Sequence, residues 1–95
     1  MPTFMLHFAC TPSREDSETE KWTADSCIIA PNVEEAEQSA RELIASRSYQ
    51  ATELIAFAEV AEEKVSSLGQ LEATLYLKAQ QNRAHRAAVF SQWHE

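Results

Sequence analysis

The sequence predicts a small α+β domain with the element order β-β-α-β-α, in which a three-stranded mixed sheet is accompanied by a long C-terminal helix. Three observations support this prediction. Two stretches near the N-terminus alternate apolar and polar residues, as half-buried strands do. A capped amphipathic segment follows them, and the last quarter of the chain carries apolar residues at helical spacing.

The first two strands are predicted on either side of a polar segment. The apolar face of the first strand consists of alternate residues, Phe4, Leu6, Phe8 and Cys10. Residues 11–20 are polar and predict a flexible acidic loop, and the second strand, residues 22–30, ends before Pro31. Pairing through this loop puts Cys10 opposite Lys21 and Cys27 opposite Phe4. The two sulfurs then lie roughly 20 Å apart, so two free thiols are expected.

The middle of the chain predicts a helix followed by a third strand. Asn32, with Glu35 three residues later, is a typical N-terminal cap for a helix over residues 33–46. Its predicted buried face consists of Val33, Ala36, Ala40, Leu43 and Ile44. The third strand, residues 52–60, is apolar on both sides, which is typical of a central strand or one covered on both faces.

The C-terminal segment 68–93 predicts one long helix. Ser67 and Gln70 form a capping-box start, and the first apolar stripe is Leu68, Leu71 and Leu75. A polar stretch separates it from a second stripe, Val89, Phe90 and Trp93. Such a helix would be about 39 Å long, whereas a compact chain of this size is roughly 32 Å across. The second stripe would therefore extend beyond the domain, unless the helix breaks near Asn82 and folds back.

The middle β-α-β unit is expected to be a right-handed crossover between parallel strands, with the first strand antiparallel to the second. This order is similar to that of a circularly permuted, ferredoxin-like split β-α-β unit that lacks an edge strand. The resemblance concerns element order alone. Three strands would leave exposed edges, which small proteins often cover with a second copy.

Composition places limits on the class of protein. The chain has 95 residues and a formal net charge of −7, which fits one domain over residues 1–95. An acidic chain is a poor direct binder of nucleic acid, because neutralising phosphates drives that affinity. The sequence has no apolar run long enough to span a bilayer and no signal-peptide pattern, so no membrane association and a cytoplasmic location are expected.

The sequence contains three weak candidates for chemistry. His7, Cys10 and Cys27 include soft metal ligands, but their spacing does not match a zinc site, and neither metal nor cofactor is expected. A second group follows the third strand and consists of Glu59, Glu62 and Glu63, which could act as acids or bases. A third consists of Arg83, His85 and Arg86, which could bind a phosphate or a carboxylate. For all three, an ordinary structural or solvated role is the favoured interpretation.

The leading functional prediction is a small non-catalytic protein that acts through protein–protein contacts, as a homodimer. The residues predicted for its interface are Arg83, Arg86, Val89, Phe90 and Trp93. Two alternatives remain open. One is an acidic inhibitor or nucleic-acid mimic that blocks a basic partner, with the acidic surface Glu15, Asp16, Glu18, Glu20, Glu34, Glu35 and Glu37. In size and charge the chain resembles phage-encoded anti-CRISPR proteins. The other is a ligand-binding or enzymatic cleft between sheet and helix that uses His7, Glu59 or His85.

Overall fold

Four strands form one antiparallel sheet in the computed structural model, which describes residues 1–13 and 20–92. The strands are β1 (Thr3–Pro12), β2 (Trp22–Ile29), β3 (Tyr49–Val60) and β4 (Arg86–Gln92). Their order in the sheet is β3-β1-β2-β4, and every neighbouring pair is antiparallel. The predicted α+β class is therefore right. The predicted three-stranded mixed sheet with a long C-terminal helix is wrong, because a fourth strand occupies part of the segment assigned to that helix.

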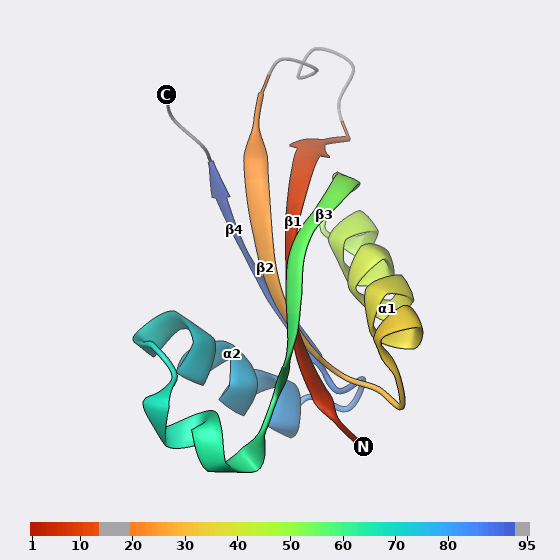
Figure 1. The fold of residues 1–95 in the computed structure, drawn as a ribbon. Helices are drawn as coiled ribbons and strands as arrows, with labels where there is room; N and C mark the ends of the chain where they lie inside the picture. The colour runs from red at the N-terminus through yellow and green to blue at the C-terminus, as the bar shows by residue number, and fades with distance from the viewer. Residues whose placement is uncertain (14–19, 93–95) are drawn as a thin grey trace.

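The helices lie on opposite faces of the sheet (Figure 1). Helix α1 (Val33–Ser46) packs along one face. The short 3-10 helix η1 (Glu62–Ser67) leads into α2 (Gln70–Gln81), which covers only one end of the other face. Strands β2 and β3 run in the same direction, but β1 lies between them, so the expected β-α-β unit joins strands that are not neighbours. The predicted antiparallel pairing of the first two strands is confirmed.

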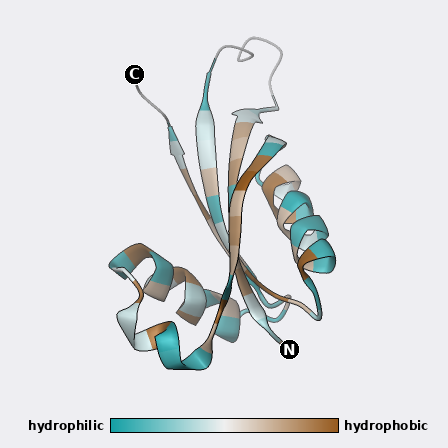
Figure 2. Cartoon of the chain, in the orientation of Figure 1, coloured by the Kyte–Doolittle hydropathy of each residue, from teal (hydrophilic) through white to brown (hydrophobic). Residues whose placement is uncertain are grey.

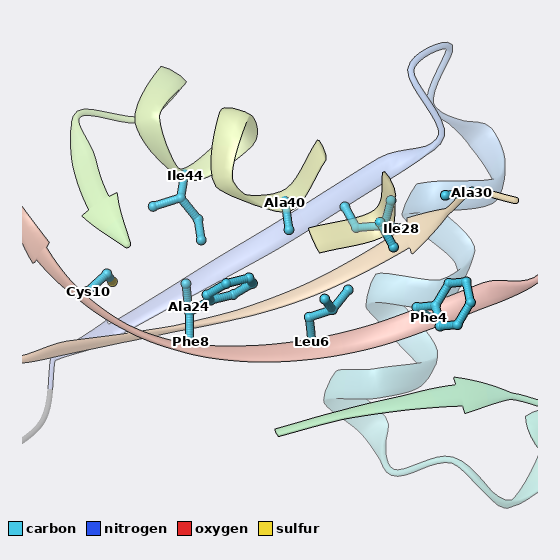
Figure 3. Packing of buried hydrophobic residues seen from close by; sticks show 10 residues of the cluster. Phe4, Leu6, Phe8, Cys10, Ala24, Ile28, Ala30, Ala40 and Ile44 are labelled. Atoms are coloured by element: carbon cyan, nitrogen blue, oxygen red, sulfur yellow. The ribbon is translucent and has the colours of Figure 1, made fainter. Parts of the chain in front are cut away.

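The main core lies between α1 and the sheet (Figure 3). The β1–β2 register pairs Phe8 with Ala24, and the side chains that the two strands give to this cluster, such as Leu6 and Ile28, point toward α1. Burying one such side chain as large as Phe8 stabilises the fold by roughly 1.5–3 kcal/mol. The register is shifted by one residue from the predicted one: Cys10 lies opposite Trp22, and Cys27 lies opposite Met5.

Helix α1 has the bounds that the sequence predicts. The side-chain oxygen of Asn32 accepts a hydrogen bond from the backbone N–H of Glu35 at 2.9 Å, which caps the first turn. Ala36 and Ala40 are fully buried, so small side chains face the sheet along this part of the helix. Trp22 packs against the same cluster.

Strand β3 is an edge strand, whereas the sequence predicted a central or doubly covered one. It begins at Tyr49, three residues earlier than predicted, and its pairing with β1 is irregular at two places. Its first half contributes Tyr49, Ala51 and Leu54 to the α1 side of the core. Residues 55–59 of its second half are all exposed.

The C-terminal segment changes direction after α2. That helix ends at Gln81, and the side-chain oxygen of Asn82 accepts a hydrogen bond from the N–H of Ala84 at 2.8 Å. His85 then adopts a left-handed backbone conformation with φ 55°, and the chain continues as β4 beside β2. The predicted helix over residues 68–93 is therefore wrong. The chain folds back as a strand, and within the residues that the structure describes no second apolar stripe extends beyond the domain.

The start of α2 also differs from the predicted capping box. The helix begins at Gln70, and Ser67 instead donates its hydroxyl hydrogen to the carbonyl oxygen of Lys64 at 2.8 Å, within η1.

We expect a chain that ends at Gln81 to lose cooperative unfolding. Without β4, the buried residues of β2 lose their neighbour on one side, and the small core loses the partly buried Phe90 and Val89. Urea unfolding followed by near-ultraviolet circular dichroism measures this. A chain that ends at Gln92 keeps β4 and is the control. A cooperative transition in the shorter chain would contradict the role given to β4.

Candidate functional site

The part of the sheet that α2 leaves uncovered carries a hydrogen-bonded pair of titratable side chains. His7 in β1 and Asp25 in β2 are direct cross-strand neighbours, with 2.6 Å between His7 Nδ1 and Asp25 Oδ1. Both side chains are about one-third exposed, at 37% and 33%. Since Phe8 and Ala24 point toward α1, strand alternation places this pair on the opposite face.

His7 lines two hollows on this face. The first, of about 210 Å³, lies between the sheet and α2, and its lining includes Met5, Ala58, Leu71 and Leu75. The second, of about 430 Å³, lies toward the end of the sheet where β1 and β2 are joined. Its lining includes Ala9, Thr23, Thr52 and Ile55. The His7 ring therefore lies where a small molecule could reach it from either side.

The geometry of the pair determines which nitrogen of His7 is available. An ionised carboxylate only accepts hydrogen bonds, so the neutral ring carries its hydrogen on Nδ1 and donates it to Asp25. Nε2 then has a free lone pair, and no residue in the described ranges bonds to it. A histidine held in this way can accept a proton at Nε2.

The three residues considered as candidate metal ligands do not come together. His7 and Cys10 point to opposite faces of the sheet, and Cys27 lies in a separate small cluster beneath α2. Within residues 1–13 and 20–92, no group of three potential metal ligands lies close together. Of the three residues predicted for a cleft, only His7 lines these two hollows; Glu59 is exposed on β3, and His85 lines a different hollow near the N-terminus.

The residues predicted for the interface that lie in β4 do not share one surface. Phe90 stacks on Tyr49 with ring centroids 4.4 Å apart, on the α1 side of the sheet, whereas Val89 packs against the cluster beneath α2. Arg86 donates a hydrogen bond to the carbonyl oxygen of Ser39 at 3.4 Å and lies 3.6 Å from a carboxylate oxygen of Glu42.

The other two residues predicted for the interface are Arg83 and Trp93. Arg83 is exposed in the turn before β4, and Trp93 lies outside the described residues. The polar group Arg83, His85 and Arg86 is likewise divided, because Arg86 is held against α1 while the other two are exposed.

The predicted acidic surface is described only in part. Glu15, Asp16 and Glu18 lie outside the described residues, and Glu20 lies just before β2. Glu34 and Glu35 are exposed in the first turn of α1. The carboxylate of Glu37 accepts a hydrogen bond from Arg41 at 3.0 Å. Two members of the separate acidic group that was considered as acids or bases, Glu62 and Glu63, are exposed in the first turn of η1.

Sequence reasoning missed Asp25, although the sequence contained a signal for it. The predicted register placed Asp25 beside Leu6, which would put a carboxylate on the most apolar face of the sheet. Shifting the register by one residue moves Asp25 away from that face and places it beside His7. A charged residue in the middle of a strand was therefore enough to choose between the two registers.

Comparison with known proteins yields no match: no family model, no curated protein and no solved structure is significantly similar to this chain. Among the described residues, no helix has the length and apolar character needed to cross a membrane.

Both cysteines are buried, on opposite sides of the sheet. Cys10 belongs to the α1 core and Cys27 to the cluster that contains Leu75 and Ala79, so the two sulfurs face away from each other. Burial raises the pKa of the Cys10 thiol to about 11 and that of the Cys27 thiol to about 11. Both thiols are therefore protonated and unreactive in the folded chain at neutral pH.

We expect the neutral His7 ring to be in the Nδ1–H tautomer. Long-range ¹H–¹⁵N correlation spectra distinguish the two ring nitrogens and measure this directly. Asp25→Ala should remove the preference, while the exposed His85 serves as an internal control in the same spectrum. A wild-type His7 with its hydrogen on Nε2 would contradict the hydrogen bond to Asp25.

The thiols also make stability depend on alkaline pH. Their pKa is raised in the folded state, so unfolded thiols ionise from about pH 9.0 while the folded ones stay protonated up to about pH 11. The contribution to stability is full below pH 9 and is lost as pH rises through 11, by at most about 1.4 kcal/mol per pH unit for each thiol. Urea unfolding over this range should show a smaller slope for the Cys10→Ala/Cys27→Ala variant. An equal slope would contradict the burial of the thiols.

Proposed function

We propose that this protein acts through protein–protein contacts, as a homodimer in which the second halves of two β3 strands pair. The observation that carries the proposal is the exposure of two large apolar side chains on one edge strand: Ile55 is 51% exposed and Phe57 is 57% exposed. Figure 2 shows brown and tan hydrophobic shades along the middle of β3. Free strand edges of this kind readily pair with another chain.

The two edges of the sheet differ in a way that favours β3. The other edge, β4, packs against both helices, and Arg86 at its start is held by α1. The second half of β3 has no such cover. Its run Ile55–Ala58 is IAFA, which contains no charge, proline or glycine to discourage pairing.

A symmetric pairing of two β3 strands has a preferred register. Antiparallel identical strands meet about a two-fold axis, so each contact occurs twice. An axis at Ala56 would place Glu53 opposite Glu59, and facing like charges destabilise a strand pair. An axis at Phe57 avoids this contact, since it brings the two Phe57 rings together and places Ala56 opposite Ala58. We therefore propose Phe57 as the centre of the pairing.

The acidic-inhibitor alternative gains less support from the geometry. The exposed pair Glu34 and Glu35 occupies the first turn of α1, where carboxylates stabilise the positive end of a helix whatever the function. Glu37 is already paired with Arg41. No further feature of the described residues favours this function.

Light scattering of the full chain should give twice the mass of one chain, and Phe57→Lys should raise the dissociation constant by about tenfold or more. The lysine would have to lose hydration at the centre of the pairing. Leu77→Lys is the matched control, because Leu77 is 56% exposed on α2 and should tolerate the change. A monomeric wild-type chain, or equal masses for wild type and Phe57→Lys, would overturn the proposal.

Cross-linking tests the register separately. Under oxidising conditions Phe57→Cys should form a disulfide-linked dimer, because directly opposite residues of antiparallel strands lie within the Cα separation that a disulfide needs. Ala56→Cys is the control and should cross-link poorly. The buried Cys10 and Cys27 should not interfere. Preferential cross-linking at position 56 would place the axis there instead.

A further inference from the structure

The His7–Asp25 pair stands at the junction of two apolar hollows, and the proposed pairing of β3 does not use it. We propose that this pair is the acid–base centre of a binding site for a small aromatic molecule with one acidic hydroxyl group, a phenol in chemical class. The hydroxyl proton passes to His7 Nε2, which leaves a phenolate beside an imidazolium ring. Charge is conserved, and no other bond forms or breaks.

The size and lining of the hollows indicate the body of the ligand. Hollows of about 210 Å³ and 430 Å³ adjoin His7, and an apolar cavity of about 150 Å³ is enough to hold a benzene ring. The walls are mainly methyl and methylene groups, from residues such as Met5, Ala58, Leu75 and Ile55. Binding sites for small molecules usually combine such walls with a few polar groups that fix the orientation.

The charges at the site indicate the polar group of the ligand. Asp25 and Glu72 both line the first hollow, so a molecule that arrives as an anion meets two carboxylates. A neutral hydroxyl group meets no such repulsion. It can donate to Nε2, the one ring nitrogen that Asp25 leaves unoccupied. Once the proton has moved, the negative charge of the phenolate lies beside the positive imidazolium ring, which offsets the two carboxylates.

A purely structural role for the His7–Asp25 pair would have different consequences from a binding role. Polar neighbours across two strands contribute roughly 0.2–1 kcal/mol to stability and need no open space beside them. Here the His7 side chain is 37% exposed, and His7 lines both hollows. A structural role affects unfolding alone, whereas a binding role also moves a proton when a ligand is added.

The test uses 4-nitrophenol, whose phenol and phenolate forms absorb visible light differently. Added to the full wild-type chain at a pH where the free probe is mainly neutral, it should bind with a rise in phenolate absorbance. The ¹⁵N signal of His7 Nε2 should move to a protonated position at the same time. 4-Nitroanisole, which has no hydroxyl group, should bind at least about tenfold more weakly.

Substitutions show whether the absorbance change depends on His7 and Asp25. His7→Gln should abolish the absorbance change, and Asp25→Asn should reduce it; His85→Gln, at an exposed histidine outside both hollows, is the control. Ala58→Leu and Ala9→Leu each fill one hollow, so the variant that blocks binding identifies the one occupied. Circular dichroism checks that each variant is folded.

Three results would overturn the proposal: no binding of 4-nitrophenol at millimolar concentration, binding without phenolate, or an unchanged signal in His7→Gln. The masses of the same samples are measured by light scattering, so failure here is distinguishable from failure of β3 pairing. A monomeric chain that yields phenolate supports this site and contradicts only the dimer.

Discussion

The antiparallel pairing of β1 with β2 is the constraint on which the rest of the structure depends. These two strands form the centre of the sheet, and each carries one of the outer strands on its free side. Their register decides which residues face α1 and which face α2, because side chains alternate along both strands. With Phe8 beside Ala24, one face becomes the core and the other receives His7 and Asp25. A shift of one residue would place Asp25 on the apolar side of β1.

The sequence predicts those parts of the fold that depend on interactions between residues close together in the chain. Helix α1 could be predicted to the residue because its cap at Asn32 and its buried stripe lie within one short segment. The faces of β1 and β2 could also be predicted, since alternation is a property of each strand alone. The relative register of the two strands depends on a pairing across the loop, and His7 and Asp25 become neighbours only through that pairing.

The C-terminal segment shows how tertiary pairing overrides local pattern. Residues 86–92 include two alanines and no proline or glycine, so their helix propensity is unexceptional. In the folded chain this segment lies beside β2 and places Val89 on one face and Phe90 on the other. The polar stretch before it, interpreted as the middle of a helix, includes the turn at Asn82 and His85. Leu71 and Leu75 of the first predicted stripe therefore lie in α2, whereas Val89 and Phe90 of the second lie in β4.

The unequal cover of the sheet connects the two proposals. Helix α1 lies along one face, but the 12-residue helix α2 covers only one end of the other. The uncovered part contains His7 and Asp25, and it adjoins the open half of β3, since Ile55 lines one hollow and Phe57 the other. Pairing along the β3 edge would leave the face itself open, because strand pairing extends a sheet sideways and does not cover it. A second chain paired with β3 would extend the sheet beside His7. The β3 edge and the sheet face that carries His7 can therefore bind different partners at the same time.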